Sequence, residues 1–279
     1  MDQDGVESVI CDLVQVNITA QNQSLTKEEA AVRATAWLQN NQQANGAWDT
    51  GGKQILATSQ ALNGLRLANV QNAGMNYGLF YLRGSKADNT DYLSRKIITL
   101  FNHGQNVDEA VNRLISKSYI YNAQIYGWGI NRLFMADALD TALGTKALAC
   151  LSIDLKDSDE TPLTDLGKLA LEVWGPLQGP ENTKYGWVPG KDTSPFVSAA
   201  VYSVTLPGTA ITGWLTNLQQ ANGAFENNIT DTAGVLIWQP DIIQDKAAAQ
   251  LYLVTTQLMN GSWENDPYLT GLCLEALLK

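Results

Sequence analysis

The sequence contains few of the residues that build common metal and nucleophilic sites. It has one histidine, His103, and three widely spaced cysteines, Cys11, Cys150 and Cys273, with no Cys-x-x-Cys pair. One histidine excludes a multi-histidine metal cage and an H-E-x-x-H zinc motif, and the isolated cysteines indicate neither a disulfide framework nor a cysteine-rich zinc site. We therefore expect no metal and no cofactor.

Positive charge is also scarce. Lys and Arg total 18 against 28 Asp and Glu, which gives 279 residues a formal net charge of −10. This balance argues against a nucleic-acid partner, which needs a basic surface. No membrane span is predicted, because no uncharged apolar run reaches about 18 residues. The N-terminal residues lack the features of a signal peptide, while the many Asn and Gln residues favour an exported or cell-surface bacterial protein.

An internal repeat is the main feature of the sequence. The tract from Trp37 to Trp48 (WLQNNQQANGAW) recurs from Trp214 to Phe225 (WLTNLQQANGAF), and the tract from Leu253 to Trp263 keeps the Gln, the Asn-Gly pair and the aromatic residue at the same offsets. Two shorter tyrosine-glycine-tryptophan copies end at Trp128 and Trp187. Such a repeat indicates a stack of similar structural units.

The segments around each copy have the start and stop signals of helices. Thr26 and Glu29 form a capping-box pattern before the first copy, and the Asn-Gly pair is a common helix end. First helices are predicted near residues 27–42, 72–84, 107–118, 161–174, 207–220 and 241–258, and second helices near 54–68, 89–101, 135–152, 193–205, 229–238 and 267–279. Each pair makes a helical hairpin.

The second helices are apolar on more than one side, which is typical of an inner layer. In the first of them, a stripe of large apolar residues lies beside a face of small residues, Ala57, Ala61 and Gly64. Hairpins of this kind bury their faces only by stacking, either into an open solenoid or into a closed ring, and six inner and six outer helices suit a ring. The sequence predicts an all-α fold, an (α/α)6 toroid with six inner and six outer helices. Residues 26–279 are predicted to form a single toroid domain and residues 1–25 a leader or linker.

The repeat resembles a known family at the spacing Leu-x3-Gln-x3-Gly-x-Trp. This is similar to the QW motif of the terpenoid cyclase and protein prenyltransferase superfamily, which includes squalene-hopene cyclase and oxidosqualene cyclase. The residues that carry the resemblance are Gln42, Gly46, Trp48, Gln219, Gly223, Phe225, Gln257, Gly261 and Trp263. In that superfamily the glutamine and tryptophan tie the end of an outer helix to the next hairpin. The resemblance therefore implies a toroid and a structural role for these residues.

The catalytic signatures of related toroids are absent. The D-x-D-D-T motif of class II cyclases, the D-x-C and histidine zinc ligands of protein prenyltransferases, and the G-C-G-E-Q thioester motif of complement domains have no match. The nearest acidic candidates are Asp157 and Asp159, in a stretch that also fits a solvated loop, and Asp137 and Asp140, which also fit the first turn of an inner helix. The missing motifs favour a protein that is not an enzyme, and the question stays open at this point.

Aromatic residues gather between an outer and an inner helix. Tyr119, Tyr121, Tyr126 and Trp128 are candidates for ligand binding, because exposed rings at the mouth of a toroid stack on sugars or line an isoprenoid pocket. The alternative is that they wedge the loop against the next hairpin.

Three functions fit the sequence. We favour a non-catalytic binding module for an apolar small molecule or a protein partner, as one part of a larger exported bacterial protein. The alternatives are an isoprenoid-acting enzyme of the cyclase or prenyltransferase type and a carbohydrate-active (α/α)6 enzyme. An apolar cavity with a protonated aspartate would favour the second, and an acidic groove lined with Tyr and Trp would favour the third.

Overall fold

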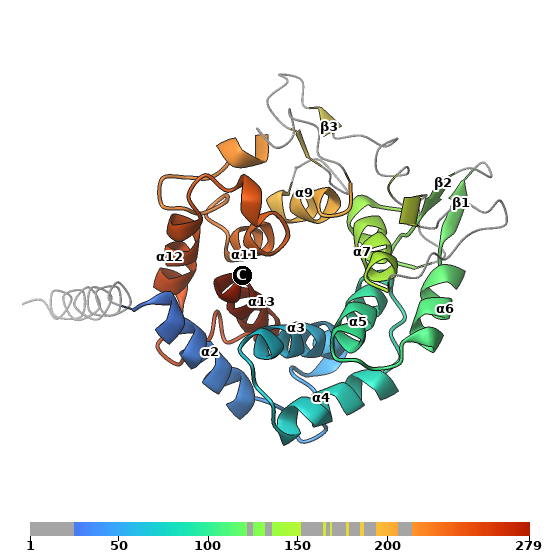
Figure 1. Cartoon of the computed structure of the whole chain (residues 1–279), viewed down its shortest axis with the longest axis horizontal. Helices are drawn as coiled ribbons and strands as arrows, with labels where there is room; N and C mark the ends of the chain where they lie inside the picture. The colour runs from blue at the N-terminus through green and yellow to red at the C-terminus, as the bar shows by residue number, and fades with distance from the viewer. Residues whose placement is uncertain are drawn as a thin grey trace, which may run out of the picture.

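The described part of the chain contains a closed ring of six inner helices (Figure 1). The structure is a computed structural model that describes residues 25–121, 125–131, 136–151, 164–165, 168, 177–178, 185–186, 194–205 and 214–279. The inner helices are α3 (Gln54–Leu67), α5 (Thr90–Asn102), α7 (Ala138–Ala149), α9 (Pro195–Tyr202), α11 (Ile229–Trp238) and α13 (Pro267–Leu278). Each inner helix contacts the next, and α13 returns to contact α3. The ring is therefore closed.

The outer layer alternates with the inner one along the chain. Its described helices are α2 (Lys27–Asn40), α4 (Ala73–Gly84), α6 (Asp108–Ser116) and α12 (Lys246–Thr256), and residues 214–217 are also helical. The predicted (α/α)6 toroid is confirmed. Residues 164–165 and 168 of the helix predicted at 161–174 are helical, and the rest of that segment lies outside the described residues, as do residues 207–213 of the helix predicted at 207–220. The division at residue 25 stays a prediction.

One predicted helix begins later than the sequence indicated. The prediction placed its start at residue 241, whereas Pro240–Ile242 form the short 3-10 helix η2 and α12 begins at Lys246. The Asp245 side chain accepts a hydrogen bond from the backbone N–H of Ala248 at 2.8 Å, which fixes the helix start.

Two short hairpins of extended chain accompany the helices. Strand β1 (Tyr119–Tyr121) pairs antiparallel with β2 (Ile125–Gly127), and β3 (Leu177–Gln178) pairs with β4 (Tyr185–Gly186). A second 3-10 turn, η1 (Gly51–Lys53), leads into α3. Sequence analysis did not predict these hairpins. They leave the ring of helices unchanged.

Side-chain caps start most inner helices. The Asn, Asp or Ser before each of five inner helices in the described chain accepts a hydrogen bond from a backbone N–H in the first turn. These residues are Asn89, Asp137, Ser194, Asn228 and Asp266. The predicted capping box is also present at α2, where Thr26 and Glu29 bond reciprocally. Local sequence therefore sets where the helices begin.

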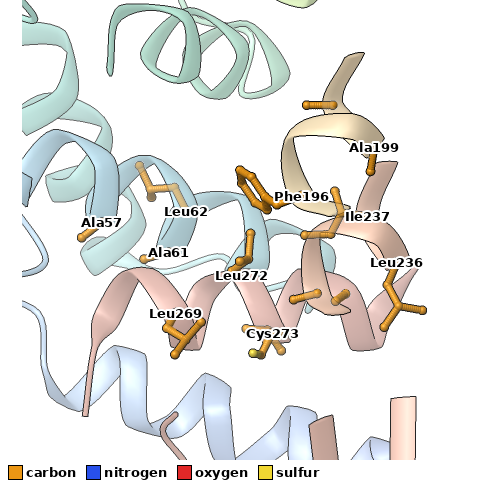
Figure 2. Packing of buried hydrophobic residues seen from close by; sticks show 14 of the residues in the cluster. Ala57, Ala61, Leu62, Phe196, Ala199, Leu236, Ile237, Leu269, Leu272 and Cys273 are labelled. Carbon is orange, nitrogen blue, oxygen red and sulfur yellow. The ribbon is translucent and has the colours of Figure 1, made fainter. Parts of the chain in front are cut away.

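The first and last inner helices pack at very short range. A Cβ atom added at Gly64 of α3 would lie 2.9 Å from the Gly271 carbonyl oxygen of α13, and one added at Gly271 would lie 2.8 Å from the Gln60 carbonyl oxygen. The predicted small-residue face of α3 is therefore where the ring closes. Figure 2 shows this part of the core, where Ala57 and Ala61 of α3 and side chains of α9, α11 and α13 pack together.

Candidate functional site

Glutamine side chains link neighbouring hairpins at the motif repeats. The Nε2 atom of Gln42 donates to the carbonyl oxygens of Gly46 and Gly74, both at 2.8 Å. Gln219 bonds in the same way to Gly223 and to Asp245 at the start of α12. Each glutamine thus joins its own loop to the next outer helix.

The last repeat uses the same geometry to close the outer layer. Gln257 Nε2 donates to the carbonyl oxygens of Gly261 and Ala30, each at 2.9 Å, and its side chain is buried. Ala30 lies in α2, which is 227 residues earlier in the chain. Gly261 has a φ of +92°, and a Cβ atom there would lie 2.6 Å from the Arg33 carbonyl oxygen of α2. Both residues therefore belong to the seam between the last and the first hairpin.

The motif aromatics are anchored on both sides. The Nε1 atoms of Trp48, Trp128 and Trp263 donate to the carbonyl oxygens of Leu38, Leu114 and Leu253 at 2.7–2.9 Å. The backbone N–H of each motif aromatic, including Phe225, donates to a threonine hydroxyl in the following inner helix. These threonines are Thr58, Thr141, Thr232 and Thr270. Sequence analysis missed them, although a threonine in each of four inner helices was the available signal.

The structure places one of the four aromatic candidates, Trp128, in the core. Trp128 is 1% exposed and bonded to Leu114, which removes it from the ligand-binding candidates. The backbones of Tyr119, Tyr121 and Tyr126 lie in β1 and β2, and their part in ligand binding stays a prediction. The acidic candidates Asp157 and Asp159 lie outside the described residues.

Asp137 and Asp140 lie together at the start of α7. Asp137 is the helix cap and accepts a hydrogen bond from the Asp140 backbone N–H at 2.9 Å. The Asp140 side chain is buried, and burial first, then the neighbouring Asp137 carboxylate, raises its pKa well above the ordinary value. Asp140 is therefore neutral at physiological pH and hydrogen-bonded to Asp137.

Arg95 of α5 reaches across the ring. Its guanidinium lies 6.0 Å from the ring centroid of Phe196 in α9 and 5.7 Å from that of Tyr268 in α13, and it forms an ion pair with Asp91. Because α5, α9 and α13 are alternate inner helices, a side chain that contacts all three occupies the ring axis. Burial lowers the pKa of Arg95, but the Asp91 carboxylate and other partners raise it by more, so the group stays charged.

A small cavity lies on the axis beside Arg95. We call it the central cavity; its volume is about 140 Å³, and residues of α3, α5, α7, α11 and α13 line it. Its charged lining residues are Arg66, Arg95, Lys146, Glu275 and Lys279. Four of these five side chains are cationic, in a chain whose net charge is −10.

A wider groove adjoins the central cavity. Its volume is about 750 Å³, and it shares Arg66 and Asn102 with the cavity. Amide side chains dominate its wall, among them Asn69, Asn72 and Gln105. His103, the residue after α5, also lines this groove. Arg66 and Asn102 therefore form part of the wall of both hollows.

The fold resembles solved structures of low sequence identity. A protein from Actinoplanes is 11% identical, with a TM-score of 0.65 over 90% of this chain and 98% of its own. The GH76A α-1,6-mannanase from Salegentibacter sp. is 12% identical, with a TM-score of 0.58 over 91% of this chain and 100% of its own. The type II terpene cyclase MstE from Scytonema is 13% identical, with a TM-score of 0.41 over 92% of this chain and 97% of its own.

This chain has the α/α toroid fold. No protein-family model matches its sequence, and no curated protein matches it. None of the described helices of the toroid is both long and apolar enough to span a bilayer. Among the described residues, no group of three or more His, Cys, Asp or Glu side chains is placed to hold a metal ion. The likeness to other toroids concerns the fold, and function must be argued from the sites.

Proposed function

We propose that this toroid is a binding module and that its ligand enters the central cavity through the amide-lined groove. The observation that carries the proposal is a cavity on the ring axis that five inner helices of the described chain line with both charged and apolar side chains. The composition, rich in Asn and Gln, supports a place within a larger exported bacterial protein.

The size and lining of the cavity weigh against an isoprenoid ligand. Pockets for drug-sized ligands have volumes of roughly 300–1,000 Å³ and mainly apolar walls. The central cavity has about 140 Å³ and contains four cationic side chains, and Arg95 occupies the axis next to it. These features favour a small polar ligand over the apolar molecule that the sequence led us to expect.

Ligand screening by thermal unfolding tests this proposal. We expect small polar molecules to raise the unfolding temperature in a saturable way, and Lys146→Met to weaken that response. Lys53→Met is the matched control, because Lys53 is exposed in η1, away from the cavity lining. A response to isoprenoid alcohols alone, equal in both variants, would contradict the proposal.

Proton-transfer catalysis by Asp140 is the second candidate function. A buried carboxyl group that stays protonated at neutral pH is a feature of general acids. However, Asp140 and Asp137 share a hydrogen bond, whereas the two carboxyl groups of a glycosidase lie about 5–9.5 Å apart to flank the bond they cleave. The pair alone does not have that geometry.

An activity assay separates the two functions. The similar fold of an α-1,6-mannanase makes α-1,6-mannotetraose the first substrate to test, with release of reducing ends as the readout. A binding module leaves the oligosaccharide intact. Cleavage by the natural chain that disappears in Asp140→Asn would establish the enzyme instead.

A further inference from the structure

We propose that the central cavity binds a small oxyanion, with the phosphate or carboxylate group held by Lys146 and Arg66. This inference rests on the proposed function, because it names the class of ligand for the same cavity. It is carried by the cavity's geometry and by the charged side chains that line it from α3, α5, α7 and α13.

The charges around the cavity do not balance. Lys279 forms an ion pair with Glu275 at 2.9 Å, and Arg95 forms one with Asp91. Within the described residues, Lys146 and Arg66 have no carboxylate within ion-pair distance. Two cationic side chains, on the inner helices α3 and α7 that flank α5, are thus left facing the same small space.

The Lys146 ammonium group contacts a hydroxyl group and an aromatic ring. Its Nζ donates to the hydroxyl oxygen of Ser203 at 3.3 Å and lies 5.4 Å from the ring centroid of Trp238. Burial first, and then the nearby Lys279 ammonium, lower its pKa to about 8, and the Glu275 carboxylate offsets only part of this shift. The charged form is therefore under-compensated in the folded chain, and an anion in the cavity would supply the missing partner.

The cavity volume limits the size of the ligand. Since a water molecule takes about 30 Å³, the 140 Å³ of the cavity has room for roughly five waters. A tetrahedral oxyanion or a short carboxylate fits this space. A sugar ring or isoprenoid chain attached to that group would extend into the adjoining groove at Arg66 and Asn102.

A purely structural role for these cations makes a different prediction. Arg66 and Lys146 lie in the last turns of α3 and α7, where positive charge stabilises a helix through its dipole. In that case Lys146→Met lowers stability in chloride buffer and phosphate has no specific effect. If Lys146 is instead part of an anion-binding site, Lys146→Met should be at least as stable as the natural chain in chloride buffer. Phosphate should then stabilise the natural chain and not Lys146→Met.

Thermal and urea unfolding with inorganic phosphate test the inference. Phosphate is titrated from 0.1 to about 30 mM at pH 7, with ionic strength held constant by sodium chloride. We expect saturable stabilisation of the natural chain and of Lys53→Met, reaching about an eleven-fold shift toward the folded state at ten times Kd. Lys146→Met should abolish the response. Arg66→Gln, at an exposed rim position, should weaken it without affecting folding.

The outcomes separate the inference from the proposed function. No saturable phosphate or acetate effect, or an equal effect in Lys146→Met, overturns the oxyanion inference. If a neutral molecule such as α-1,6-mannotetraose still stabilises the natural chain, and Arg66→Gln weakens that effect, the binding module stands with another ligand class. If inorganic phosphate stabilises the chain and a phosphorylated small molecule binds more tightly than inorganic phosphate does, the oxyanion inference holds and the natural ligand has further groups attached to its anionic group.

Discussion

Gln257 is expected to contribute more to stability than its counterparts in the other repeats. Gln257→Met keeps the side-chain volume and removes two hydrogen bonds, to Gly261 and to Ala30. At about 1 kcal/mol for each bond, and with the cost of leaving a buried carbonyl oxygen unpaired, the loss should be about 2–4 kcal/mol. Gln219→Met removes three hydrogen bonds, two donated by Nε2 and one that Oε1 accepts from the Asp245 backbone N–H. Its position is partly exposed, so water replaces the lost partners and about 1 kcal/mol should be lost.

Urea unfolding of both variants measures this difference, with hydrogen exchange as a local readout. Gln257→Met should also speed exchange of amides in α2 and α12, which are the two outer helices at the seam. Gln219→Met should leave α2 unchanged. Equal losses of unfolding free energy, or α2 exchange that does not respond to Gln257→Met, would refute the reasoning that this side chain closes the outer layer.

Three further substitutions test the backbone and the buried charges. Gly261→Ala should destabilise the fold by about 2–4 kcal/mol, because the added Cβ would lie 2.6 Å from the Arg33 carbonyl oxygen at a φ of +92°. The control Gly51→Ala, at a φ of +74° with open space around it, should cost about 1 kcal/mol. Similar losses of unfolding free energy in urea for the two variants would count against the close contact. Lys146→Met in chloride buffer should stabilise the chain at pH 7 by up to about 3 kcal/mol, because the pKa of Lys146 in the folded chain, about 8, is below the unfolded value of 10.5. This gain in unfolding free energy should shrink as the pH rises from 8 to 10.5, and a gain that does not vary with pH would contradict the prediction. Asp140→Asn should stabilise the chain at pH 7 but not at pH 4. The neutral Asp140 carboxyl group contributes fully to folding stability below its unfolded pKa, and this contribution is lost as the pH rises toward its raised pKa in the folded chain. Unfolding free energies of the natural chain and the variant, measured from pH 4 to pH 7, test this prediction.

Local signals explain why the ring could be predicted. The helix starts follow from capping residues such as Asp137 and Asp266, whose interactions lie within one turn. The small residues on one face of α3 indicated an inner helix. That this face closes the ring, where the backbones of two helices approach each other at Gly64 and Gly271, was seen only in the structure. Both kinds of signal are visible in short windows of sequence.

The chemistry of the ring centre could not be predicted in this way. Arg95, Lys146 and Arg66 belong to three different helices, and only closure of the ring brings them to one cavity. Each of the three is a charged residue on an inner helix, where burial is expected, and this was the feature of the sequence that could have indicated a charged centre. The threonine partners of the motif aromatics were missed for a related reason, since Thr58 and Thr270 differ from ordinary helix residues only in their tertiary hydrogen bonds.

The charged ring centre is the central claim, and a high-resolution crystal structure with crystals grown in phosphate tests it most directly. The account predicts density for Arg95 between the rings of Phe196 and Tyr268, and a tetrahedral anion in the cavity within hydrogen-bond distance of Lys146. An open apolar tunnel along the axis, with Arg95 turned away from it, would contradict the account.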